Sequence, residues 1–153
     1  MNFNNIEINN WYKTEAGNIN SKLLVNTINK IFYTSSDKNI IFFGPNLIIK
    51  QIMDNHYSFN SFYIATSDNS DIKAEMQKLP FQDSSIDFVV LIHSLDVDEN
   101  PHAVFREIDR VLAEDGKIII AGFNRLSFLG IHSLMPIKSI FRNKKYISIS
   151  RLS

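Results

Sequence analysis

The run IDFVVLIH, residues 86–93, constrains the fold more than any other part of the sequence. A strand with one wet face alternates apolar and polar residues, whereas this run is almost continuously apolar. It is therefore predicted to be a central strand of a parallel sheet, buried on both faces. Two similar runs predict further buried strands: NIIFF at residues 39–43 and KIIIAGF at residues 117–123.

Helical patterns lie between these strands. Apolar residues at helical spacing predict one helix over residues 19–33 and another over residues 46–53, with Asn46 as its N-cap. A third helix is predicted to start at Asn100 and Pro101, because asparagine caps a helix and proline suits its first turn.

This third helix has two distinct faces. Its apolar residues recur at helical spacing and predict the buried face: Val104, Ile108, Val111 and Leu112. Its charged residues predict a solvated, salt-bridged surface: Arg106, Glu107, Asp109 and Arg110. Gly116 is predicted to end the helix in the left-handed conformation.

Two weaker β-rich runs, residues 60–66 and 71–75, complete the pattern. Strands that alternate with helices predict an α/β fold with a mostly parallel sheet of about five strands. Ligands of such sheets bind beyond the carboxyl ends of the strands. Gly44, His93 and the segment 66–75 all fall at those ends, so a single ligand-binding site is predicted there.

Composition narrows the class of protein. A length of 153 residues suits a single domain, in which residues 1–18 are expected to be partly flexible. The formal net charge is +0, so there is no strong nucleic-acid signal. Cysteine is absent and the four histidines are scattered, so no metal site is predicted. No apolar run reaches the ~20 residues of a membrane span, and a cytoplasmic location is expected.

Two stretches carry a family likeness: LPFQDSSIDFVV at residues 79–90 and REIDRVLAEDGKIII at residues 106–120. They resemble the Leu-Pro-Phe element, fourth strand, helix and fifth strand of class I S-adenosylmethionine-dependent methyltransferases. WYKTEAG at residues 11–17 and GFNRLSFLG at residues 122–130 are similar to a little-characterised bacterial branch of that family. The resemblance implies a Rossmann-like methyltransferase sheet, S-adenosylmethionine as the cofactor and an unknown methyl acceptor.

The resemblance also implies cofactor-binding residues, namely Gly44, Glu75, Met76 and His93, and assigns no catalytic residue. Glu75 would accept a hydrogen bond from the adenine amine, because an ionised glutamate is an acceptor only. Met76 would add its backbone N–H and a soft apolar contact. Two roles stay open for His93: a general base, or the preferred one, a histidine that packs beside the adenine or bonds to backbone.

The first loop departs from the family pattern. Phe42 stands where the resemblance expects an acidic residue, and Pro45, which lacks an N–H, follows Gly44. Residues 65–67 replace the acid expected at the ribose, with Asp68 slightly beyond. Two lost charge-assisted bonds of ~1.5–3 kcal/mol each would weaken binding roughly 10²- to 10⁴-fold.

Three readings of function follow. The first is a methyltransferase, either active or degenerate. The second is a non-catalytic remnant or interaction protein that keeps the fold without the cofactor. The third is a nicotinamide enzyme, which is less well supported because its fingerprint of three spaced glycines is absent.

The C-terminal part is expected to lack the last two strands of the family, with residues 124–153 forming an irregular or helical tail. The strand at residues 117–123 would then present an unpaired apolar edge. Marginal stability is expected unless the tail or a second copy of the chain covers that edge, and self-association would occur there.

Overall fold

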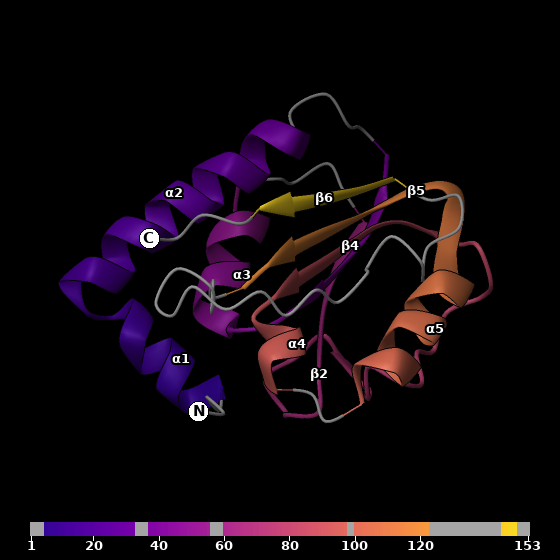
Figure 1. The fold of residues 1–153 in the computed structure, drawn as a ribbon, viewed down its shortest axis with the longest axis horizontal. Coiled ribbons are helices and arrows are strands. Elements are labelled where there is room, and N and C mark those ends of the chain that lie inside the picture. The colour runs from indigo at the N-terminus through magenta and orange to yellow at the C-terminus, as the bar shows by residue number, and fades with distance from the viewer. Residues whose placement is uncertain (1–4, 33–36, 56–59, 98–99, 123–144, 150–153) are drawn as a thin grey trace, which may run out of the picture.

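The computed structural model describes residues 5–32, 37–55, 60–97, 100–122 and 145–149. Figure 1 labels most of its helices and strands. In chain order they are α1 (Asn5–Tyr12), α2 (Glu15–Phe32), β1 (Asn39–Phe43), α3 (Asn46–Met53), β2 (Asn60–Ala65), β3 (Ile72–Lys73), β4 (Ile86–Ile92), α4 (Ser94–Val97), α5 (Pro101–Val111), β5 (Leu112–Ala121) and β6 (Lys145–Ile149).

One sheet contains all the described strands, in the order β3-β2-β1-β4-β5-β6. Every neighbouring pair is parallel. The chain runs outward from β1 to β3 and then returns to β4 on the other side of β1. The predicted α/β class with a parallel, Rossmann-like sheet is therefore confirmed, and the strand order reverses between β1 and β4.

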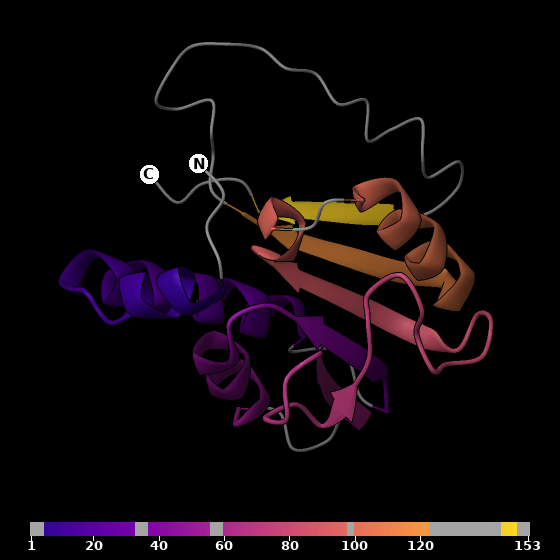
Figure 2. The same cartoon turned by 90° about the horizontal axis from the view of Figure 1, so that it is seen from below.

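The central strands are buried on both faces because their side chains alternate. Ile40 and Phe42 of β1 pack into a core cluster with α1, α2 and α3. Ile41 and Phe43 pack on the opposite face, in a cluster with α5. Figure 2 shows α5 and α3 on opposite sides of the sheet. The prediction of a doubly buried central strand at residues 86–93 is confirmed for β4.

The two crossover helices begin differently. At α5 the side chain of Asn100 accepts a hydrogen bond from the N–H of Ala103 at 3.2 Å, and Pro101 lies in the first turn, as predicted. At α3 the N-cap is Pro45, no side chain caps the helix, and Asn46 already lies inside it. The predicted Asn46 cap is therefore wrong by one residue.

The end of α5 also differs from the prediction. The helix ends at Val111, and Leu112 takes an extended backbone with φ −73° and ψ 129°. Gly116 lies inside β5, so its assignment as a left-handed helix terminator is wrong. The β4–β5 register shifts between Ile86 and Phe88, which accommodates the extra residues at the start of β5.

The N-terminal segment forms helices where partial flexibility was expected for residues 1–18. α1 buries Ile8 and Tyr12, which lie one helical turn apart, in the cluster shared with α2 and α3. α2 begins at Glu15, four residues earlier than predicted. The polar composition concealed α1, because its packing rests on the buried Ile8 and Tyr12 and the partly buried Trp11.

β6 corrects the expectation for the C-terminal part. It pairs with β5 from Lys117 and Lys145 to Ala121 and Ile149. Residues 145–149 are thus a strand within the segment predicted to be irregular or helical, and the described sheet has six strands rather than about five. The edge of β5 that was expected to be open is paired with β6, so the reason to expect marginal stability there is removed. The remaining predictions for residues 124–144 and 150–153 lie outside the described residues.

Candidate functional site

A cavity of about 420 Å³ lies at the carboxyl ends of β1, β2, β3 and β4, where the strand order reverses. Helix α1 adds a wall through Ile6 and Asn9. Three of the four predicted cofactor residues, Gly44, Glu75 and Met76, line this cavity. Further polar lining residues are Asn9, Asn46, Tyr63, Thr66, Ser67, Asn69, Gln77 and Ser94.

Gly44 is required at its position by packing. Its φ of +137° is a conformation that residues with a side chain rarely adopt. A Cβ added there would overlap the carbonyl oxygen of Ile92 at the end of β4. The glycine therefore allows the loop after β1 to pass close to β4, whether or not a ligand is bound.

Tyr63 fixes the same loop from the side of β2. Its hydroxyl donates a hydrogen bond to the carbonyl oxygen of Gly44 at 3.1 Å. Burial raises the pKa of the Tyr63 hydroxyl, which keeps its proton for this bond. Sequence patterns gave no sign of this role, because Tyr63 reads simply as a strand residue.

Glu75 and Met76 lie on a turn that follows β3. The N–H of Lys78 donates to the carbonyl oxygen of Glu75 at 3.1 Å, and the N–H of Ala74 donates to the carbonyl oxygen of Ala65 at 3.1 Å. The Glu75 side chain is exposed at the rim, whereas Met76 is half-buried and packs against the α5 cluster. A carboxylate and a thioether thus lie next to each other on the cavity wall.

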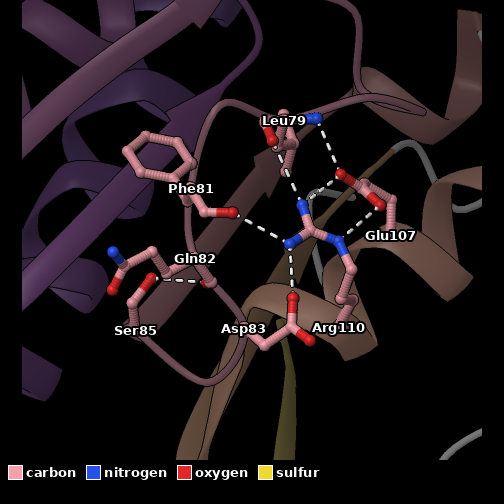
Figure 3. Close-up of polar contacts among 7 residues, drawn as sticks. All are labelled: Leu79, Phe81, Gln82, Asp83, Ser85, Glu107 and Arg110. Carbon is pink, nitrogen blue, oxygen red and sulfur yellow. Dashed lines mark hydrogen bonds and ion pairs between the residues drawn. The ribbon is translucent and has the colours of Figure 1, made fainter.

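The segment after this turn is bound by Glu107 and Arg110 of α5, as Figure 3 shows. Glu107 accepts the N–H of Leu79 at 2.7 Å, and Arg110 donates to the carbonyl oxygen of Leu79 at 3.1 Å. The hydrogen bond from Arg110 lowers the pKa of Glu107, against the opposing effect of burial. Arg106 and Asp109 are exposed as predicted, but Glu107 and Arg110 are half-buried, so a fully solvated face is wrong for them.

His93 lies behind the cavity wall. Its side chain is 1% exposed, and its Nε2 is 2.7 Å from the hydroxyl of Tyr12. It does not line the cavity, although its neighbour Ser94 does. Burial raises the pKa of Tyr12, so this hydroxyl remains protonated at neutral pH. The sequence did not predict the contact of Tyr12 with His93, because 81 residues separate them in the chain.

The departures from the family pattern have structural explanations. Phe42 is 2% exposed and packs edge-to-face on Phe32, so its side chain points into the core rather than into the cavity. Asp68 forms an exposed ion pair with Lys73 at 2.8 Å and is not part of the cavity lining. Phe42 and Asp68 therefore do not supply the two acidic anchors that the family pattern expects in the cavity.

The described residues contain no group of three or more side chains that could hold a metal ion. None of the helices in the described ranges has the length and hydropathy that a bilayer span requires. His102 is exposed in the first turn of α5, and His56 and His132 lie outside the described residues.

The fold and cavity define a class of protein: a doubly wound α/β domain with a ligand site where the strand order reverses. Residues 46–120 match the family model described as a methyltransferase domain. This match covers 75 of the 153 residues, just under half of the chain, and agrees with the methyltransferase resemblance of the sequence.

Curated relatives match parts of this chain. The uncharacterised protein YafS of Escherichia coli is 44% identical over 66 residues, which is 43% of this chain and 28% of the relative. The sterol 4-C-methyltransferase strm-1 of Caenorhabditis elegans is 35% identical over 82 residues, which is 51% of this chain and 25% of that protein. The chain thus spans under a third of the length of these relatives.

Solved structures share the fold. An S-adenosylmethionine-dependent methyltransferase from Aquifex aeolicus superposes with a TM-score of 0.58 at 13% identity, covering 91% of this chain and 81% of that one. A Methanococcus maripaludis structure assigned to the same class gives a TM-score of 0.62 at 20% identity, covering 80% of this chain and 65% of that one. At 20% and 13% sequence identity, these two superpositions are evidence of a shared fold alone.

Proposed function

We propose that the cavity binds S-adenosylmethionine and that the domain transfers its methyl group to an acceptor. The observation that carries this proposal is that Gly44, Glu75 and Met76 line one cavity at the carboxyl ends of the strands, in a chain whose residues 46–120 match a methyltransferase domain. The volume of about 420 Å³ falls within the ~300–1,000 Å³ of small-molecule sites.

The lining suits this cofactor chemically. Apolar residues and neutral hydroxyl and amide groups surround the cavity, as expected for a nucleoside with many donors and acceptors. Among the described lining residues, Glu75 alone carries a formal charge. Its carboxylate can accept the adenine amine as a charge-assisted hydrogen bond, and a negative wall tolerates a cationic ligand.

In this proposal the chain contributes binding and orientation. The bound cofactor supplies an electrophilic methyl group on a sulfonium sulfur, and in-line transfer depends largely on positioning. Glu75 accepts a hydrogen bond from the adenine, and Met76 packs on the ligand. Tyr63 holds the loop at Gly44, and His93, bonded to Tyr12, supports the wall at Ser94 without serving as the base.

The nicotinamide alternative fits this cavity less well. A dinucleotide brings a pyrophosphate, which favours glycine-rich backbone N–H groups or cations. Pro45 at the α3 N-cap has no N–H, and the charge that the described lining residues supply is the carboxylate of Glu75. Both features oppose a pyrophosphate.

The non-catalytic alternative is favoured by two specific observations. Phe42 and Pro45 leave the first loop without an acid and without one backbone donor. In addition, packing alone explains why Gly44 is a glycine. Under this alternative the fold persists and the cofactor does not bind.

Calorimetric titration of the chain with S-adenosylmethionine and, separately, with S-adenosylhomocysteine separates the two. The methyltransferase proposal predicts binding of both ligands, with dissociation constants from micromolar to millimolar because two anchors are lost. Absence of heat at millimolar ligand, with the domain shown to be folded by circular dichroism, would reject the proposal in favour of the non-catalytic alternative.

A further inference from the structure

We infer that Glu107 and Arg110 are positioning residues for the purine end of the ligand, because they fix the turn that carries Glu75 and Met76. This inference rests on the proposed function. It goes beyond it by assigning a role in binding to two residues of α5 that do not line the cavity.

Arg110 uses its whole guanidinium in this contact. Its Nη1 donates to the carbonyl oxygen of Phe81 at 2.9 Å and to Asp83 at 2.7 Å. Its Nη2 donates to the carbonyl oxygen of Leu79 at 3.1 Å and to Glu107 at 2.6 Å. Its Nε donates to the second oxygen of Glu107 at 3.0 Å. These five bonds match the five N–H donors of an arginine.

Glu107 completes the contact from the same helix. Its Oε1 accepts the N–H of Leu79 at 2.7 Å, so both backbone polar groups of Leu79 are bound by the pair. The Glu107 side chain is 15% exposed, which strengthens these bonds relative to a fully solvated ion pair. Figure 3 shows the pair between α5 and the segment from Leu79 to Asp83.

The fixed segment joins directly to the cavity wall. Leu79 follows Lys78, whose N–H closes the turn on the carbonyl oxygen of Glu75. On its other side the turn is tied to β2 through Ala74 and Ala65. The Glu75 side chain itself is exposed and carries no core packing that would hold it. The α5 pair therefore anchors this turn through polar contacts on its C-terminal side.

A lysine cannot replace this arginine. Lysine keeps the positive charge but offers three donors from one point, without the planar fork that reaches Leu79, Phe81 and Asp83 together. Arg110→Lys therefore tests geometry at constant charge. Arg106→Lys is the matched control, because Arg106 is an exposed arginine on the same helix.

The experiment measures dissociation constants for S-adenosylmethionine and adenosine by calorimetry, at a temperature where every variant is fully folded. Arg110→Lys is expected to weaken both ligands 5- to 20-fold, whereas Arg106→Lys leaves them within twofold, on the general scale of lost hydrogen bonds. A double-mutant cycle combines Arg110→Lys with Glu75→Gln. If the arginine acts through Glu75, the double variant binds no more than threefold weaker than the weaker single variant.

Amide exchange without ligand provides an independent readout. Arg110→Lys is expected to speed exchange of the Leu79 and Lys78 amides selectively, leaving β4 amides unchanged. If Arg110→Lys binds with wild-type affinity, or if its loss of binding free energy adds fully to that of Glu75→Gln, the positioning role is overturned and the proposed function is not. Failure of the wild-type chain to bind either ligand overturns the proposed function and the positioning role together.

Discussion

The Nε2 atom of His93 lies 2.7 Å from the hydroxyl of Tyr12, and this contact joins helix α1 to the end of β4. Both side chains are buried, and the rings are 5.7 Å apart. The backbone of His93 is left-handed, with φ 54°, and its N–H donates to the carbonyl oxygen of Ala121 at 2.7 Å. His93 thus connects α1, β4 and β5, and it does not line the cavity.

Tyr12→Phe is predicted to destabilise the domain by about 1–3 kcal/mol, because the substitution leaves a buried imidazole without this hydrogen bond. For a domain of this size the melting temperature should fall by about 2–4 °C per kcal/mol. Thermal unfolding by circular dichroism measures the change. Unaltered stability would show that the hydroxyl contributes nothing to the position of α1.

Gly44→Ala is predicted to destabilise by about 2–6 kcal/mol, because unfavourable φ and overpacking against the Ile92 carbonyl add together. Gly116→Ala is the comparison. A Cβ at Gly116 would meet the side chain of Leu112 at 2.6 Å, which can move, and the carbonyl oxygen of Ala113 at 2.8 Å. Because Gly116 has no positive φ and its backbone contact is longer than that of Gly44, a smaller loss is expected. Urea unfolding of both variants gives the order, and an equal or reversed order would contradict the packing argument.

Local sequence patterns were sufficient for the central part of the fold. β1 and β4 were predicted because a strand buried on both faces leaves a short, continuous apolar run. The start of α5 was predicted because Asn100 and Pro101 carry a signal that depends on neighbouring residues only. Such signals also placed Gly44 and the segment after β2 at one end of the sheet.

Contacts between distant residues were not accessible in this way. Tyr12 meets His93 across 81 residues, and Glu107 meets Leu79 across 28. Glutamate and arginine on a helix usually indicate a solvated surface, and tertiary contacts overrode that pattern at Glu107 and Arg110. The same override turned the asparagine-rich N-terminus into a packed helix through Ile8 and Tyr12.

Glu75→Gln is predicted to weaken S-adenosylmethionine binding by about 1.5–3 kcal/mol, roughly 10- to 150-fold, since the charge-assisted acceptor is lost. Stability should change by less than about 0.5 kcal/mol because the side chain is exposed. Glu114→Gln, an exposed glutamate near the start of β5, should leave affinity unchanged. Equal affinities for all three proteins, measured by titration calorimetry, would remove Glu75 from the site.

Phe42→Asp introduces the acid that the family pattern expects, and the structure predicts that it unfolds the domain rather than restoring a cofactor anchor. Phe42 is buried against Phe32, so an aspartate there would be a buried, unpaired charge costing more than about 4 kcal/mol. Phe42→Leu keeps an apolar core and should cost about 1–2 kcal/mol. A folded Phe42→Asp protein that binds the cofactor more tightly would contradict this placement of the side chain.

Glu107 makes stability depend on pH in a defined direction. Hydrogen bonding from Arg110 holds the pKa of Glu107 below its usual value of about 4.3, although burial opposes the shift. Between the folded and unfolded pKa values the unfolded chain binds more protons, so stability rises with pH there. The contribution is complete above the unfolded value and is lost as pH falls through the folded value.

Glu107→Gln is therefore predicted to be less stable than wild type by about 1–3 kcal/mol at pH 6, and to approach wild-type stability as the pH falls below about 4. Urea unfolding across pH 3–6 measures both curves. Glu114→Gln should follow the wild-type curve, because Glu114 is exposed and outside the contact with Leu79. A constant difference between Glu107→Gln and wild type over this range would mean that the carboxylate charge does not stabilise the segment beside the cavity.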